Sequence, residues 1–217
     1  MAMFRQPALA YLAVALTAGI TGCGSSGSAS ALASDSATTI FAEATANTIA
    51  AQSFTIAGGT SSSLFVDLTI VRGLGCSGTI VQGTTTSKLI WIGKTVYEHT
   101  SGMPANEWMR GASTASGVQG LIALCNPSSL LAPLSATGIS SATRSVTVYH
   151  GQPALALTLP GTEQDPSQTG SIVVTDTQKP VLLNVSEPGS GAFAFTGYGA
   201  TKTIAPPGTL HRPGPPA

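Results

Sequence analysis

Charged residues are scarce in this sequence. Asp, Glu, Lys and Arg make up 8% of its 217 residues, and 9 basic residues balance 9 acidic ones. Nucleic acid is bound largely through Lys and Arg, so the absence of a basic excess argues against a nucleic-acid partner. Apolar residues nevertheless supply 42% of the chain and occur in periodic runs, so we expect a folded domain rather than a disordered chain.

Catalytic and metal-binding motifs are also lacking. The sequence contains no G-x-S-x-G nucleophile elbow and no H-E-x-x-H zinc helix. Its histidines, His99, His150 and His211, lie far from one another and from the cysteines, so no spacing typical of a metal site arises. We therefore expect a protein that is not an enzyme and that needs no metal or cofactor.

Only one long apolar run is present, and it lies near the N-terminus. Arg5 precedes the stretch 7–20, which is shorter than the roughly 20 apolar residues that a membrane-spanning helix needs. A charged start, an apolar middle and a small-residue end are typical of a secretory signal. We predict that residues 1–22 are a signal peptide.

The end of this signal is its most informative part. Ile20-Thr21-Gly22-Cys23 resembles the lipobox of bacterial lipoproteins. The resemblance implies that Cys23 receives diacylglycerol and becomes the first residue of the mature chain; the alternative is a plain signal peptide followed by a chance cysteine. Two acyl chains give stable anchoring. We therefore expect a lipid-anchored protein on the extracytoplasmic face of the cell membrane.

Cysteine is otherwise limited to Cys76 and Cys125. An even pair in an exported chain lies in a compartment where disulfides persist. We predict that these two residues form a disulfide, and that it ties a strand to a later helical segment.

The rest of the chain divides into three parts. Residues 23–34 form a Gly/Ser/Ala-rich linker, 35–205 one domain, and 206–217 a Pro/Gly-rich tail that we expect to be disordered. In the domain, apolar residues at spacings of three and four predict a helix that ends near Ala51. Alternating apolar residues between turns predict strands at 53–57, 64–71, 76–82, 87–92, 95–100, 144–150, 154–159, 169–176, 180–187 and 192–198.

Between the two groups of strands, the segment 102–134 has few β-branched residues, and we interpret it as one or two short helices with a new start at Asn126-Pro127. Short connections favour antiparallel pairing, and a sheet of this many strands tends to curl. The fold class expected is therefore α+β: a curled antiparallel sheet, or half-barrel, with a few helices on its concave face.

At this point a family can be named. The chain resembles actinobacterial envelope lipoproteins of the LolA/LprG/LppX-like lipid-carrier group, in which similar motifs follow one another in the same order. The residues that carry this resemblance are the stretches 75–80, 89–97, 107–109, 125–131, 151–153 and 179–180. The resemblance implies a half-barrel whose helices cap an apolar cavity for the acyl chains of a lipid or glycolipid.

Ten residues are candidates for the wall of such a cavity. The helix would contribute small and apolar side chains, the strands would contribute inward-facing ones, and an aromatic ring would stand at the rim, where it tolerates apolar and wet surroundings together. These residues are Ile40, Phe41, Ala44, Val66, Leu68, Trp108, Leu155, Leu157, Phe193 and Phe195. For Trp108, Phe193 and Phe195, packing in an ordinary core is the alternative.

Two functions from different classes follow. The first is a lipoprotein that binds or carries a lipid or other apolar ligand at the envelope. The second is a structural or protein-interaction lipoprotein with a fully packed core and no ligand. An enzyme, built in space from a serine, His99 and Asp67, ranks third. The sequence identifies no protein partner. A cavity of hundreds of Å³ would favour the first function, because ligand sites usually have that size.

Overall fold

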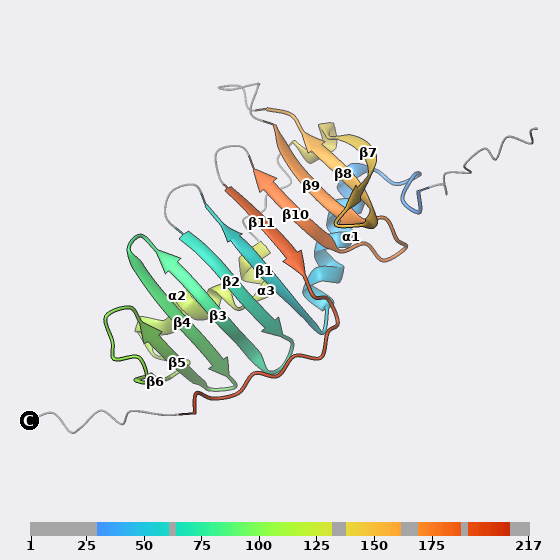
Figure 1. Cartoon of the computed structure of the whole chain (residues 1–217). Helices are drawn as coiled ribbons and strands as arrows, with labels where there is room; N and C mark the ends of the chain where they lie inside the picture. The colour runs from blue at the N-terminus through green and yellow to red at the C-terminus, as the bar shows by residue number, and fades with distance from the viewer. Residues whose placement is uncertain (1–29, 61–63, 132–137, 162–168, 188–190, 209–217) are drawn as a thin grey trace, which may run out of the picture.

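The computed structural model of the protein describes residues 30–60, 64–131, 138–161, 169–187 and 191–208. One 11-stranded antiparallel sheet dominates it, in the order β6-β5-β4-β3-β2-β1-β11-β10-β9-β8-β7 (Figure 1). The helices are α1 (Ala37–Ala50), α2 (Gln119–Leu124) and α3 (Pro127–Leu131), with single 3-10 turns at Ser116–Val118 and Ile139–Ser141. The strands are β1 (Ser53–Gly59), β2 (Leu64–Val71), β3 (Gly75–Gln82), β4 (Thr85–Ile92), β5 (Thr95–Thr100), β6 (Met109–Ala112), β7 (Thr143–Tyr149), β8 (Gln152–Leu159), β9 (Gly170–Thr175), β10 (Leu182–Glu187) and β11 (Gly191–Thr196).

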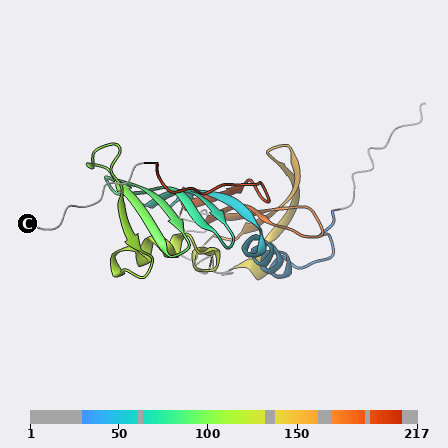
Figure 2. The same cartoon turned by 90° about the horizontal axis from the view of Figure 1, so that it is seen from below.

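The sheet is open, and its edge strands are β6 and β7. Seen along the sheet, the strands curl over the helices, which all lie on the concave side (Figure 2). The α+β fold with a curled antiparallel sheet is thus confirmed.

Two meanders make up this sheet, and they join through β1 and β11. Thr55 lies opposite Thr196 and Gly58 opposite Phe193. Gly58 has a φ of 146°, and a side chain there would overlap the carbonyl oxygen of Ala192. Glycine therefore allows the two meanders to approach closely, and strand β1 continues two residues past the end predicted at Ala57.

Helix α1 forms where the sequence predicted it. The Ser36 side chain accepts a hydrogen bond from the Thr39 amide (3.1 Å), which caps the first turn. Ile40, Phe41 and Ala44 point into the core beneath the half of the sheet that β8, β9 and β10 form. Alanine-rich helices have little apolar area to bury, so this one depends on further contacts to stay in place.

A polar network supplies such contacts at the end of α1. The Tyr198 hydroxyl donates to the Leu182 carbonyl (2.6 Å), and the Leu182 amide donates to Thr48 Oγ1 (3.0 Å). The Thr48 hydroxyl is then left to donate to Tyr198 Oη (3.3 Å). Burial raises the pKa of the Tyr198 phenol above its usual range, against the effect of the Thr48 hydrogen bond. The phenol therefore remains a neutral donor, and the network fixes α1 to the sheet.

The linker expectation is wrong for its last residues. Leu32 is 1% exposed and belongs to the core, and the Ser30 hydroxyl donates to Asp176 Oδ1 (2.8 Å). Burial of an apolar side chain such as that of Leu32 stabilises a fold, so residues 30–34 belong to the folded body, which does not begin only at Asp35. The rest of the predicted linker lies outside the described residues, as do the predicted signal peptide and Cys23.

The central segment also differs from the expectation. Helices α2 and α3 are present, and α3 begins after Asn126, as predicted. Met109–Ala112, however, forms strand β6, with Met109 opposite Glu98 and Gly111 opposite Val96. This strand is short and largely exposed, so the alternation of buried residues that marks a strand in a sequence is missing from it.

The predicted disulfide is confirmed. Cys76 on β3 and Cys125 at the end of α2 are bonded, with their Cα atoms 5.7 Å apart. Both residues are buried. The bond therefore attaches the α2–α3 segment to the concave side of β3, near the start of that strand.

Candidate functional site

The α2–α3 segment crosses the concave face of the sheet and leaves an apolar cleft on each side. Leu121, Ile122, Leu124 and Leu130 rest on the core, and Leu131 is buried in it. One cleft has a volume of about 460 Å³ and the other about 350 Å³. Both volumes fall in the usual range of ligand sites, about 300–1,000 Å³.

The larger space, called here the β2–β3 cleft, lies between the end of α1, the turn that joins β2 to β3, and the start of α3. Its wall includes Phe54 and Trp91 from the sheet, Ile49 from α1, and the disulfide residue Cys125. Arg72, an exposed residue of the turn, is the charged residue of this lining. One of its N–H groups donates to the Ala50 carbonyl (3.1 Å), which holds the guanidinium at the mouth.

The smaller space, called here the β10–β11 cleft, lies at the opposite ends of the strands. Leu64, Val185 and Phe193 come from the sheet, and Leu124 and Leu130 come from α2 and α3. Glu187 is the charged residue of this lining, and partial burial raises the pKa of its carboxyl. Both clefts thus have apolar walls. Their charged residues have opposite signs: Arg72 lines the first cleft and Glu187 the second.

A third, smaller hollow of about 210 Å³ lies between residues 30–33 and β7. Its wall includes Leu32, Leu155 and Arg144, and Arg144 hydrogen-bonds the Asp35 carbonyl. It lies below the usual size range of ligand sites, so it is not a candidate.

Most of the residues predicted to line a cavity instead form the packed core. Ile40, Ala44, Val66, Leu68 and Leu157 are each 0% exposed, and Phe41 and Phe195 are buried beside them. Leu155 borders the small hollow, and Phe193 alone of the ten lines one of the two clefts. The small residues of α1 allow the helix to approach the sheet closely, so they leave no space there.

The aromatic residue predicted for the rim lies on the other face of the sheet. Trp108 precedes Met109 and stands next to His99, with ring centroids 5.7 Å apart. Met109 shares the concave face with Glu98 and Leu89, so alternation puts His99 and Trp108 on the convex face. The cleft tryptophan is Trp91, whose indole N–H donates to the Gly93 carbonyl (2.7 Å). Side chains alternate between the two faces along β4, so the positions of Ser87 and Leu89 could have shown that Trp91 lies on the concave face.

Because α1 packs tightly, Ala44→Leu is expected to destabilise the protein. Ala44 is 0% exposed, and the added methylenes have no space to enter. Overpacking of this kind costs about 1–3 kcal/mol. Urea unfolding of the variant measures it, with Ala42→Leu, on the exposed side of the same helix, as the control. An Ala44→Leu variant as stable as the wild type would place a void at α1 after all.

The Glu187 carboxyl should make a small contribution to the free energy of unfolding, and this contribution should depend on pH. Because its folded pKa is raised, the free energy of unfolding falls as the pH rises from the unfolded pKa through the folded one. As the pH rises from 3 to 7, the free energy of unfolding of Glu187→Gln should therefore increase relative to that of the wild type. The gain should stay below about 1 kcal/mol, because the carboxyl is only partly buried and solvent screens it. Equal differences between the two proteins at both pH values would contradict this.

In the described part of the chain, no three His, Cys, Asp or Glu residues gather closely enough to hold a metal ion. Among the described helices, none is both long and apolar enough to cross a membrane.

Comparisons with known proteins show the fold. No family model and no curated protein sequence matches this chain. Among solved structures it is similar to LprF from Mycobacterium bovis, with a TM-score of 0.53 and 13% identity over 79% of this chain and 96% of LprF. The Mycobacterium tuberculosis lipoprotein LppX aligns with a TM-score of 0.43 and 13% identity, over 78% of this chain and 98% of LppX. The predicted resemblance to this group is therefore confirmed at the level of the fold.

Proposed function

We propose that the chain is a membrane-anchored extracytoplasmic lipoprotein that binds or carries a lipid, or another molecule with long apolar chains, at the cell envelope. The observation that supports this proposal best is the pair of apolar clefts beside α2–α3. A core that is tightly packed under α1 but open beside α2–α3 leaves apolar walls facing solvent, and such walls are stabilised when a ligand covers them.

The charges at the mouths favour a ligand with a polar head. Arg72 has five N–H donors, of which one is seen donating to Ala50. The others suit an anionic headgroup, such as a phosphate, while the acyl chain lies against Trp91 and Phe54. In this proposal the protein has no catalytic role: it holds the lipid and releases it unchanged.

A quenching experiment tests this proposal. Trp91 lines the β2–β3 cleft, so a lysophosphatidylglycerol with a brominated acyl chain should quench its fluorescence, in a Trp108→Phe background that removes the other tryptophan. The same lipid should raise the melting temperature, since a ligand at 100 times its Kd adds about 2.7 kcal/mol.

Two variants that fill the clefts show which space is used. Ala51→Phe places a ring in the β2–β3 cleft, and Ala123→Phe does so in the β10–β11 cleft. Ala42→Phe, on the exposed side of α1, is the matched control and should bind like the wild type. If the wild type shows neither quenching nor a thermal shift, the chain is better described as a structural or protein-interaction lipoprotein without a ligand.

A further inference from the structure

One edge of the sheet collects features that the proposed clefts do not explain. The turns β2–β3, β4–β5, β7–β8 and β9–β10 all lie at the same ends of the strands, because neighbouring strands are antiparallel and in register. The segment that follows β11 runs along this edge as well (Figure 1). Its Gly199 amide donates to the Ser53 carbonyl (3.0 Å), and the Ser53 hydroxyl donates to the Ala200 carbonyl (2.6 Å).

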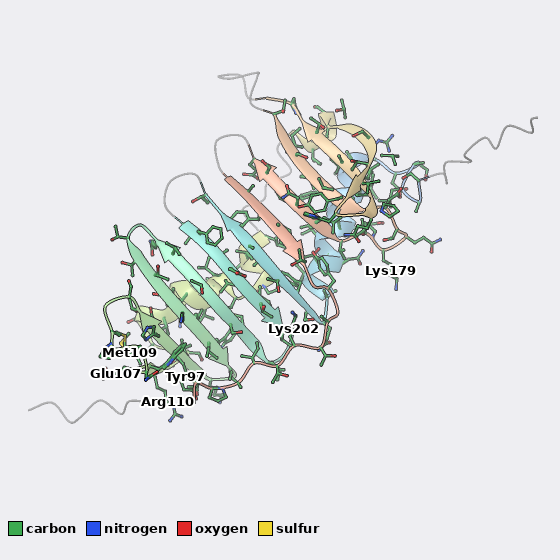
Figure 3. All side chains as sticks on the ribbon, viewed as in Figure 1. Tyr97, Glu107, Met109, Arg110, Lys179 and Lys202 are labelled. Carbon is green, nitrogen blue, oxygen red and sulfur yellow. A yellow bond between two sulfur atoms is a disulfide. The ribbon has the colours of Figure 1, made fainter. Side chains whose placement is uncertain are left out.

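Positive charge is concentrated at this edge, which is called the basic edge below. Arg72, Lys94, Lys179 and Lys202 are all exposed there. Figure 3 shows Lys179 and Lys202 along it. One described acidic residue, Asp176, also lies at this edge, and its carboxylate accepts a hydrogen bond from the Ser30 hydroxyl. In a chain whose charges balance overall, this edge is a local cationic surface.

The N-terminal part of the chain enters at the same edge. Ser30 contacts Asp176 in the β9–β10 turn, and Cys23 precedes Ser30 by seven residues. Seven residues span at most about 25 Å. A lipid on Cys23 would therefore hold the basic edge close to the bilayer, within reach of its headgroups.

Apolar side chains accompany the cations. Leu74, in the β2–β3 turn, is 50% exposed, and Val148, beside the β7–β8 turn, is 69% exposed. Leu74, Arg72 and Gly93 also belong to the lining of the β2–β3 cleft, so the mouth of that cleft lies at the basic edge. Cations interspersed with exposed apolar residues are typical of surfaces that bind at a membrane interface.

We propose that the basic edge docks on an anionic lipid surface, so that the β2–β3 cleft opens directly onto the bilayer from which its lipid comes. The inference rests on the proposed function in two respects, the lipid at Cys23 and the lipid ligand of the β2–β3 cleft. In the docked state, the acyl chain of the lipid would move from the bilayer to the cleft along Leu74. It would therefore not be exposed to water on the way, which would be unfavourable for an apolar group. The opposite end of the strands, with the β10–β11 cleft, would face away from the membrane.

The experiment uses the lipidated protein reconstituted in vesicles of phosphatidylcholine alone or mixed with phosphatidylglycerol. An environment-sensitive fluorophore is attached to Leu74→Cys, or, as the control, to Thr84→Cys, an exposed position in the β3–β4 turn at the opposite end of the strands. With phosphatidylglycerol, the label at residue 74 should shift to the blue and lose its quenching by aqueous iodide. The label at residue 84 should not change, and 1 M salt should reverse the effect at residue 74.

Charge variants test the electrostatic part. Lys202→Gln should lower the ratio of docked to undocked protein about fivefold, and the double variant Lys179→Gln/Lys202→Gln about 25-fold. Lys88→Gln, an equal change of charge in the middle of the sheet, should leave the ratio unchanged.

Two results would overturn the docking surface while the protein still floats with the vesicles: labels at residues 74 and 84 that are equally accessible to iodide, or equal losses of docking for Lys88→Gln and Lys202→Gln. A protein that floats with neither kind of vesicle would overturn the lipid anchor, and the docking surface with it. Absence of lipid from the clefts would overturn the proposed ligand and the transfer from the bilayer to the cleft, but not the docking of the basic edge.

Discussion

Replacing Cys23 with alanine is expected to remove the protein from the membrane fraction and leave it unprocessed or soluble. The reason is the lipobox-like end of the signal, Ile20–Cys23, in which only a cysteine thiol can accept the diacylglycerol. Two acyl chains give stable anchoring, whereas no helix in the described part of the chain can replace them. Phase separation in detergent and the intact mass of the mature protein measure this.

A control for this variant is Ser26→Ala, which changes a nearby small residue and should leave the fractionation and the acylation as they are, with a mass lower only by the oxygen atom that the substitution removes. If Cys23→Ala partitions into detergent and is processed like the wild type, the N-terminal segment is a plain signal peptide. The clefts would then belong to a protein held at the envelope by other means.

Removing the disulfide should have the largest effect on stability. Cys76→Ala/Cys125→Ala opens a link with a sequence separation of 49 residues, for which the chain-entropy model gives about 4 kcal/mol. The α2–α3 segment would also lose its covalent attachment to β3, between the two clefts. We therefore expect a large fall in the free energy of unfolding, together with weaker binding of the lysolipid probe.

Chemical unfolding with and without a reducing agent separates this effect from the loss of two side chains. The reductant should destabilise the wild type by a similar amount and leave the double variant unchanged. If the double variant lost less than about 1 kcal/mol, the α2–α3 segment would be held by packing alone, through Leu121, Leu130 and their neighbours.

The sequence was sufficient to predict the sheet apart from β6, because local chemistry determines the other strands. Leu64–Val71 alternates apolar and polar residues, and the short gap between the predicted strands 87–92 and 95–100 is the turn that joins β4 to β5. The disulfide could be predicted as well, since exclusion of Cys23 left one possible pair. The spacing of Ile40, Ala44 and Thr48 was sufficient to predict α1, whereas the choice of Ser36 as its cap came from the structure.

The position of the clefts could not be predicted, because it depends on how closely each helix approaches the sheet. Small residues on α1 were compatible with a void or with close packing, and the structure shows close packing at Ala44. The clefts arise instead because α2 and α3, 6 and 5 residues long, cover only the middle of their half of the sheet. Trp91, by contrast, could have been assigned to the concave face, because it lies two residues after Leu89 and four after Ser87 on the same strand; what the sequence did not show is that a cleft lies beside it.

Native mass spectrometry of the protein extracted in mild detergent from its own envelope tests lipid binding most directly. We expect a mass above that of the acylated chain by one lipid, which dissociates on collisional activation and is absent from Ala51→Phe or Ala123→Phe. A mass equal to that of the covalently acylated chain alone, for a protein extracted with its disulfide intact and its fold preserved, would contradict a lipid-binding function.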